Sequence, residues 1–446
     1  MGPGSCLGTA LRTPVLAGVC GVFWCAAHAL PDADSGLRIE DLAKIAEGWR
    51  GEVIAEVDQS YAGWDVEIGD ADNDGANEVL VVGCPDSRLY LFEKADGAWR
   101  RRLLAERLAR RTPGMGLAVR VVDLDRDGRN EVVVGTGQEA AEPAFLYVFQ
   151  TDGTRITREI TARAFLDGSA FTHNLAFHDL DGDGLLEIVT AYCGSGEVTR
   201  FDVRPGLAGI DRRKIYHLSG SGEDCCLSDV DNDGTVELIL CNSYREDQGR
   251  VEILEFRPDG ELVIPPRVTI DGFDGQKCFD CAVEVGDLDG DGRRELIVGW
   301  NRKQGIAKGT VLGYRVEPEG GARRLWTFAL EDDRLDLGYF EKMMCIADAD
   351  NDGRNELVVS TRGERQWGGR GLGHVFLYRL GAGGEVSETL LADFHDGRVE
   401  SSWIAVGDAD GDEKNEVVIA TGGGPRDRPG RSYVVSIEPM DTSTSP

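Results

Sequence analysis

The stretch VEIGDADNDGANEVLVV, residues 66 to 82, decides the fold. It carries Asp70, Asp72 and Asp74 at alternate positions, and Glu78 stands eight residues after the first Asp. A short aliphatic segment precedes the acidic residues and a β-branched run follows them. This pattern predicts a strand, a polar loop and a second strand.

The same acidic loop occurs seven times, and the first Asp of successive copies is 50 to 61 residues apart. Counting that Asp as position 1, every copy has Asp at positions 1, 3 and 5 and Glu at position 9. The seven sets are Asp70, Asp72, Asp74 and Glu78; Asp123, Asp125, Asp127 and Glu131; Asp179, Asp181, Asp183 and Glu187; Asp229, Asp231, Asp233 and Glu237; Asp287, Asp289, Asp291 and Glu295; Asp348, Asp350, Asp352 and Glu356; and Asp408, Asp410, Asp412 and Glu416.

Two more strand segments follow each loop, such as the aromatic run 89–92 and the segment 99–104. Four strands in roughly 40 to 60 residues, repeated many times, are typical of propeller blades and longer than most solenoid repeats. The sequence therefore predicts an all-β fold, a seven-bladed β-propeller of four-stranded blades with one acidic loop in each.

The last unit has no fourth strand, because the chain ends soon after the run 433–437. Residues 49–57 resemble the fourth-strand segment 99–104, so we expect this N-terminal strand to close the ring and leave no open sheet edge. The expected domains are a lead-in at 30–48, the propeller at 49–439 and a disordered C-terminal tail at 440–446.

Carboxylates at positions 1, 3 and 5, followed by Gly at position 6 and a backbone carbonyl at position 7, offer the hard oxygen ligands that Ca²⁺ prefers. An EF-hand would need Glu at position 12, where these loops have aliphatic residues or Thr. The alternative is that the Asp residues only form turns. We expect up to seven structural Ca²⁺ sites. The last loop has Glu413 in place of Gly, which predicts strain and a weaker site if position 6 needs a positive φ.

These units resemble the FG-GAP or VCBS repeats of integrin α-subunit propellers and of many exported bacterial proteins. The resemblance covers about residues 50 to 437. It implies that the loops are structural calcium sites, and it does not identify a ligand, because fold does not fix function.

The N-terminus predicts export. Residues 1–29 have Arg12 as their only charge, then an apolar run, then Ala27-His28-Ala29, which resembles a signal-peptidase site. An uncleaved anchor is the alternative, although about 15 apolar residues are short for a membrane span. We expect a signal peptide at 1–29, no membrane span in the mature chain, and a secreted or periplasmic protein.

Eight cysteines would remain after cleavage. For Cys225, Cys226 and Cys345, at the entrances of inner strands, we expect disulfides between adjacent blades, with unpaired buried thiols as the alternative. Cys278 and Cys281 fit a small disulfide loop, a redox pair or half of a zinc site.

The formal charge of −31 and the isoelectric point near 4.6 argue against binding of nucleic acid or anionic membranes. They fit a soluble protein or one with bound cations, and we expect a monomer.

The loops opposite the acidic ones are expected to form the binding face, because they carry basic and aromatic residues that suit an anionic glycan or an acidic protein surface. Ordinary solvated loop residues are the alternative. The candidate binding residues are Trp64, His173, Trp300, Arg302, Arg362, Trp367 and Arg426.

Two functions remain open. The first is an exported, calcium-stabilised binding or scaffold module for a glycan or protein partner, without enzymatic activity. The second is a polysaccharide lyase that removes a proton beside a charge-neutralised uronate. Its candidate bases are His173, Lys277, Tyr339, Lys342 and His395.

Overall fold

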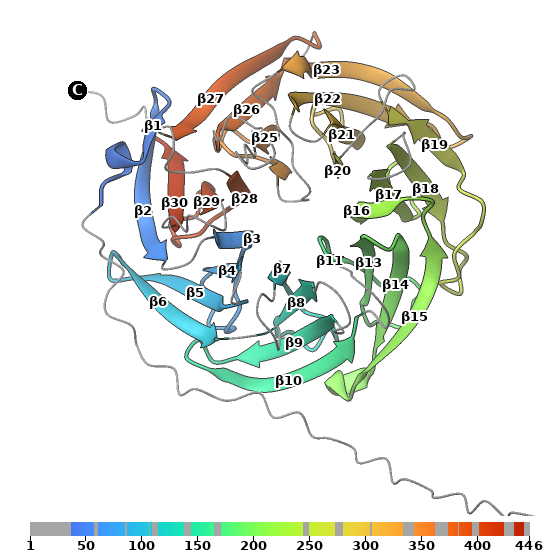
Figure 1. The fold of residues 1–446 in the computed structure, drawn as a ribbon, viewed down its shortest axis with the longest axis horizontal. Coiled ribbons are helices and arrows are strands. Elements are labelled where there is room, and N and C mark those ends of the chain that lie inside the picture. The colour runs from blue at the N-terminus through green and yellow to red at the C-terminus, as the bar shows by residue number, and fades with distance from the viewer. Residues whose placement is uncertain are drawn as a thin grey trace, which may run out of the picture.

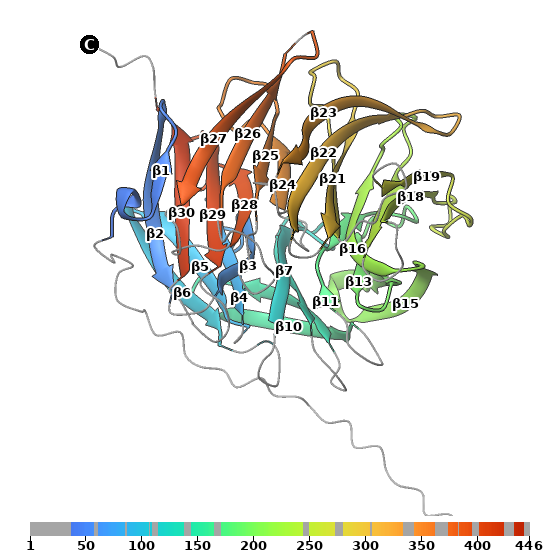
Figure 2. The same ribbon diagram turned by 45° about the horizontal axis from the view of Figure 1, so that its top comes forward.

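The computed structural model describes residues 37–57, 61–84, 87–106, 108, 115–137, 144–164, 171–243, 249–272, 280–303, 306–332, 343–361, 373–381, 383–394, 401–422 and 432–440. Seven blades surround a central axis, and each has its first strand nearest that axis (Figure 1). The strands run between the two faces of the disc, as the tilted view shows (Figure 2). The predicted seven-bladed β-propeller is confirmed.

The first four blades follow the chain in order. Blade one holds β3 (Tyr61–Gly69), β4 (Glu78–Cys84), β5 (Leu89–Ala95) and β6 (Ala98–Ala105); blade two holds β7 (Met115–Val122), β8 (Glu131–Gly137), β9 (Phe145–Thr151) and β10 (Ile156–Arg163). Blade three holds β11 (Phe171–Thr172), β12 (Ala176–His178), β13 (Glu187–Cys193) and β14 (Glu197–Val203), then the 3-10 helix η2 (Pro205–Leu207) and β15 (Ile210–His217); blade four holds β16 (Ser221–Ser228), β17 (Glu237–Ser243), β18 (Arg250–Glu255) and β19 (Val268–Asp271).

The last three blades follow the same plan. Blade five holds β20 (Asp280–Gly286), β21 (Glu295–Lys303), β22 (Ile306–Val316) and β23 (Ala322–Asp332); blade six holds β24 (Met344–Ala347), β25 (Glu356–Ser360), β26 (Val375–Leu380) and β27 (Val386–Phe394). Blade seven holds β28 (Ser401–Gly407), β29 (Glu416–Gly422) and β30 (Ser432–Pro439).

The N-terminal segment contributes strands to two blades. After the 3-10 helix η1 (Ile39–Asp41), β1 (Ala43–Ile45) pairs with β27 of blade six. Then β2 (Trp49–Val57) pairs with β30 in a register that runs from Trp49 opposite Pro439 to Val57 opposite Ser432. Both pairs lie side by side in the two views (Figures 1 and 2). The sequence analysis did not anticipate a strand within 30–48.

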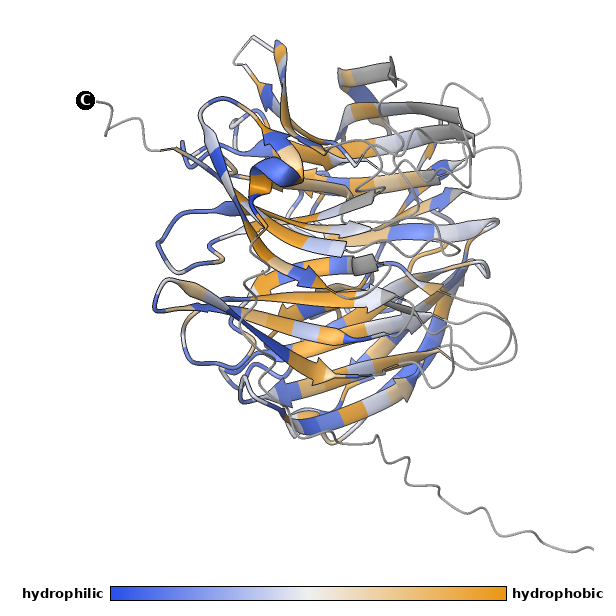
Figure 3. Cartoon of the chain, turned by 60° about the vertical axis from the view of Figure 1, so that its left-hand side comes forward, coloured by the Kyte–Doolittle hydropathy of each residue, from blue (hydrophilic) through white to orange (hydrophobic). Residues whose placement is uncertain are grey.

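The hydrophobic core is divided among the junctions between blades. The buried residues of the described chain form seven hydrophobic clusters, and each joins two neighbouring blades. The β-branched run from Val79 to Val82, for example, is fully buried. Figure 3 shows apolar residues along the strands and polar residues in the turns that connect them. Burying both faces of every blade is what stabilises the ring.

A chain of polar contacts crosses the inner edges of five blades near the axis. Asp65 on β3 accepts hydrogen bonds from the Val119 backbone and from Arg120 of β7, both in blade two. Arg120 also donates to Asn174 in blade three, and Asn174 donates to Asp224 on β16. Asp224 accepts a further bond from the Val283 backbone of blade five. This network fixes the relative position of adjacent blades.

One disulfide links two blades. Cys241 on β17 bonds with Cys281 on β20, and their Cα atoms are 6.1 Å apart. The cross-blade disulfide therefore lies elsewhere than the sequence suggested, because Cys225, Cys226 and Cys345 form none with other described residues. Cys278 lies outside the described residues, and Cys281 is already bonded to Cys241, which removes the small-disulfide-loop, redox-pair and half-zinc-site interpretations.

Candidate functional site

The strand register places all seven acidic loops in the same way. In every blade the Glu at position 9 is the first residue of the second strand and pairs with the last residue of the inner strand, as Gly69 pairs with Glu78. The loops therefore lie on one face of the disc.

The carboxylates organise the loop backbone. In loop one, Glu78 Oε2 accepts a hydrogen bond from the Ala71 N–H at 2.8 Å, and Asp70 Oδ2 accepts one from the Gly75 N–H at 3.1 Å. Asp74 Oδ1 accepts one from the Ala76 N–H at 2.9 Å. Equivalent bonds occur in the other six loops. The acidic residues therefore shape the loop as well as offering oxygens.

Two positions in each loop have left-handed backbone. Position 6 has a positive φ in all seven loops and is Gly in six of them; in the seventh, Glu413 has φ 67°. Glu413 therefore has the positive φ that the sequence predicted for it. Position 4 also has a positive φ throughout and is Asn, Gly or Arg, a feature that the sequence analysis missed.

The Glu at position 9 is buried in every blade, with 0 to 2% of its surface exposed. Burial is the main cause that raises the pKa of Glu78 and Glu416 to about 8 and of Glu131, Glu187, Glu237 and Glu356 to about 7. Burial also raises the pKa of Glu295, although less, because Arg315 donates a hydrogen bond to it. Buried carboxylates without a counter-charge resist ionisation.

Several buried carboxylate oxygens lack a hydrogen-bond donor among the described residues, and a bound cation would supply the missing interaction. Glu78 Oε1, Asp125 Oδ1, Asp179 Oδ1, Asp181 Oδ1 and Glu416 Oε1 are buried and accept no hydrogen bond within the described residues. In at least four of the loops, three carboxylates have oxygens within 4.8 Å of one another. Orphaned buried oxygens in a cluster fit Ca²⁺, which takes six to eight oxygen ligands. The oxygen ligands of these loops are therefore compatible with Ca²⁺ binding.

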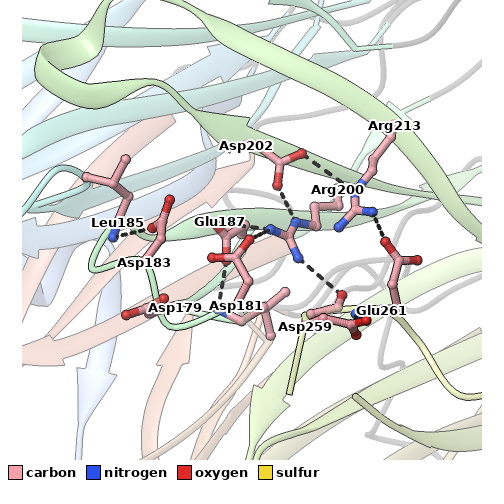
Figure 4. Close-up of polar contacts among 12 residues, drawn as sticks. Asp179, Asp181, Asp183, Leu185, Glu187, Arg200, Asp202, Arg213, Asp259 and Glu261 are labelled. Carbon is pink, nitrogen blue, oxygen red and sulfur yellow. Dashed lines mark hydrogen bonds and ion pairs between the residues drawn. The ribbon is translucent and has the colours of Figure 1, made fainter. Parts of the chain in front are cut away.

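Basic side chains reach the position 3 Asp in five of the loops. In loop three, the buried Arg200 pairs with Asp181 and Asp202 and lies 3.4 Å from Glu187 (Figure 4). The other four contacts are Arg267 with Asp231, Arg315 with Asp289, Arg379 with Asp350 and Lys94 with Asp410. These cations partly balance loops three to seven.

Neighbouring loops are joined by side-chain amides. Asn130, at position 8 of loop two, donates through Nδ2 to the Asp70 carbonyl at 2.9 Å, and its N–H donates to Asn73 Oδ1. The same position 8 bond occurs from Asn355 to Asp287 and from Asn415 to Asp348. These residues were not predicted from the sequence, although Asn recurs just before the position 9 Glu in four of the seven loops.

Two of the candidate binding residues have described side chains, and both are buried. His173 is 4% exposed, and Trp300 is fully buried in the cluster between blades four and five. They are therefore not exposed contacts. The side chains of Trp64 and Arg302, and all of Arg362, Trp367 and Arg426, lie outside the described residues.

The candidate lyase bases are not brought together in the described chain. His173 lies 3.5 Å from Glu223 in a buried position. Lys277, Tyr339, Lys342 and His395 lie outside the described residues. No described contact therefore favours proton abstraction.

Comparison with known proteins supports the repeat assignment. A family model described as FG-GAP-like repeat matches residues 70–134, 123–190 and 229–298. No curated protein matches the chain. Within the described residues, no helix has the length and apolar character needed to cross a membrane. The three matched repeats and the seven-bladed ring together match an FG-GAP repeat β-propeller.

Proposed function

We propose that this propeller is an exported binding or scaffold module that is stabilised by Ca²⁺ in its acidic loops. The observation that carries the proposal is the group of buried carboxylate oxygens that accept no hydrogen bond within the described residues, exemplified by Glu78 Oε1 and Glu416 Oε1. Burying an unbalanced carboxylate is costly, and a bound cation removes that cost.

The number of basic side chains that balance the carboxylates differs between loops, so the loops should differ in how strongly their stability depends on calcium. In loops one and two, the position 3 residues Asp72 and Asp125 have no ion pair with a described basic side chain, whereas loops three to seven have one. Burial and the neighbouring Asp74 raise the pKa of Asp72. We therefore assign the strongest calcium dependence to loops one and two. Loop one ranks first, because the pKa of Glu78 is raised to about 8 and that of Glu131, which accepts a hydrogen bond from Gln150, to about 7.

The partner is proposed to be a glycan or a protein that binds the face opposite the acidic loops. An FG-GAP propeller is a rigid disc whose loops carry the variable chemistry, which suits a binding role. Export rests on the N-terminal segment 1–29, and calcium is available to extracellular modules at the millimolar level at which weak sites fill.

The test is thermal unfolding of the mature chain in excess Ca²⁺ and in excess chelator. A ligand present at ten times its Kd adds about 1.4 kcal/mol per site. Several sites should therefore raise the unfolding temperature by many degrees. Asp74→Asn should lower calcium stoichiometry by about one. The matched control is Asp96→Asn in the exposed β5–β6 turn, which should bind calcium like the parent.

A glycan array on the calcium-loaded protein, with ultraviolet detection of unsaturated products, tests the partner. Binding without new absorbance supports a binding module, whereas new absorbance would indicate a lyase. Unfolding that is indifferent to chelator would contradict the calcium proposal.

A further inference from the structure

A second cluster of metal-ligating groups lies at the junction of blades three and four, at the other end of β13 from its acidic loop. His173, Cys193 and Glu223 each offer one ligand atom, and the three atoms lie within 4.8 Å of one another. His173 stands where the inner strand of blade three is interrupted between β11 and β12. Cys193 ends β13, and Glu223 lies near the start of β16. These strands are close together near the axis (Figure 1).

Glu223 is the observation that points to a ligand. Its side chain is fully buried, and neither carboxylate oxygen accepts a hydrogen bond from any described residue. Among the described residues, the nearest nitrogen that can carry a charge is His173 Nδ1, at 3.5 Å. A buried carboxylate in this setting needs a cation or a proton.

The local backbone directs Glu223 into the cluster. The ladder between β16 and β17 shifts register between Gly222 and Asp224, so Glu223 is the extra residue of a β-bulge. A Cβ at Gly222 would stand 2.8 Å from the Ala191 side chain, so Gly is needed for β16 to approach β13 this closely. Bulges commonly re-aim a side chain toward a site.

His173 is held by its two neighbours. Thr172 donates a hydrogen bond to the Thr136 carbonyl at 3.0 Å. Asn174 donates to Asp224 Oδ1 at 2.8 Å and to the Cys225 carbonyl at 2.6 Å. A histidine fixed on both sides is preorganised for ligation, which lowers the entropy lost on binding.

We propose that His173, Cys193 and Glu223 bind one divalent transition-metal ion of the zinc class. One imidazole nitrogen, one thiolate and one carboxylate form a mixed set that zinc accepts, and three protein ligands leave a fourth position for water or an anionic ligand. In a tetrahedral site, such ligand atoms lie about 3.3–3.6 Å apart. The 3.5 Å between His173 Nδ1 and Glu223 Oε2 matches this spacing.

The charges also balance. Binding displaces the Cys193 proton, so one thiolate and one carboxylate neutralise the two charges of the ion. The acidic loops supply only carboxylates and suit hard cations, whereas the sulfur ligand selects softer ones. The proposal is therefore independent of calcium binding in the loops.

The experiment is a Co²⁺ titration of the full mature chain in excess Ca²⁺, followed by ultraviolet and visible spectroscopy. The excess Ca²⁺ keeps Co²⁺ out of the hard sites. The expected result is a thiolate charge-transfer band that saturates at about one Co²⁺ per chain and disappears when Zn²⁺ is added.

The variants assign the ligands. Cys193→Ser should abolish the charge-transfer band, and the matched control Cys345→Ser should keep it. His173→Gln should weaken Co²⁺ binding at least about tenfold, whereas His217→Gln on the exposed edge of blade three should leave it unchanged. The isosteric Glu223→Gln should weaken binding similarly, and circular dichroism checks that each variant is folded.

A wild-type protein without the band would overturn the proposal without reference to any variant. His173 and Glu223 would then only contact each other within the junction. A band that survives Cys193→Ser would overturn it equally, since the sulfur ligand would lie elsewhere.

Discussion

Asn77 Nδ2 donates a hydrogen bond to the backbone carbonyl of Asp408 at 2.8 Å, although 331 residues separate them. Asn77 occupies position 8 of loop one, and Asp408 occupies position 1 of loop seven. The bond thus joins the first and last acidic loops where the ring closes. It links ring closure to the shape of two candidate calcium sites.

Asn77→Ala should lower the free energy of unfolding by about 1–2 kcal/mol, because the Asp408 carbonyl loses its partner in a half-buried setting. Urea unfolding in excess Ca²⁺ measures this. Asn77→Asp keeps the size of the side chain but places a carboxylate against the carbonyl oxygen, so it should cost more. Equal stability of all three proteins would show that the contact does not hold the ring closed.

The unfolding of the calcium-free protein should depend on pH in a defined direction. Burial raises the native pKa of Glu78 and Glu416 to about 8, above the usual glutamate value of 4.5. Between these values the native state retains protons that the unfolded chain has released, so the free energy of unfolding falls as pH rises. The loss should be complete above about pH 8, where both states are ionised.

Thermal unfolding in chelator from pH 5 to pH 9 tests this dependence. Calcium needs ionised ligands, so the stabilisation that added Ca²⁺ confers should grow over the same range. A calcium-free protein that gains stability as pH rises from 5 to 8 would contradict the assigned burial of these carboxyl groups.

The repeat was predictable because its chemistry recurs within each unit. Alternate Asp residues, the Glu at position 9 and the flanking apolar runs are local signals, and they led directly to the blades and the loops. The contacts between blades were not predictable. The bond from Asn130 to Asp70 depends on how far each blade rotates about the axis, and no single repeat contains that information.

The sequence also did not indicate which of the candidate binding residues are buried. Trp300 was expected in an exposed loop, but β21 extends to Lys303, so Trp300 remains in a strand and faces the core. Gly272 makes room for it, since a Cβ there would lie 2.9 Å from the indole ring. Such complementarity between distant residues is a property of packing, not of local pattern.

Loop seven offers a test of backbone strain. Glu413 has φ 67° at a position where the other six loops have Gly. Glu413→Gly should stabilise the protein by about 1 kcal/mol, because Gly has no Cβ to strain in the left-handed region. Gly353→Glu in loop six is the mirror variant, and it should destabilise by a similar amount. A Cβ at Gly353 meets no atom within 4 Å, so no steric clash would add to the strain.

Denaturant midpoints of the two variants, measured with and without Ca²⁺, check this expectation. Calcium affinity should rise in Glu413→Gly if the strained residue weakens the seventh site. A neutral Gly353→Glu would indicate that position 6 tolerates any residue, and the account of the seventh loop would then fail.

Arg200 offers a test of whether a basic side chain and Ca²⁺ neutralise the same carboxylates. Its side chain is 1% exposed and balances Asp181, Glu187 and Asp202 around loop three. Arg200→Leu leaves these carboxylates without their cation, which should lower the free energy of unfolding by about 3–5 kcal/mol in chelator. In excess Ca²⁺ the loss should be smaller, because the metal ion can neutralise the same oxygens.

The exposed Arg204→Leu is the control, because its pair with Asp211 lies in solvent and contributes little. If calcium does not reduce the cost of Arg200→Leu, the guanidinium and the metal ion do not share these ligands, and loop three holds its arginine in place of calcium.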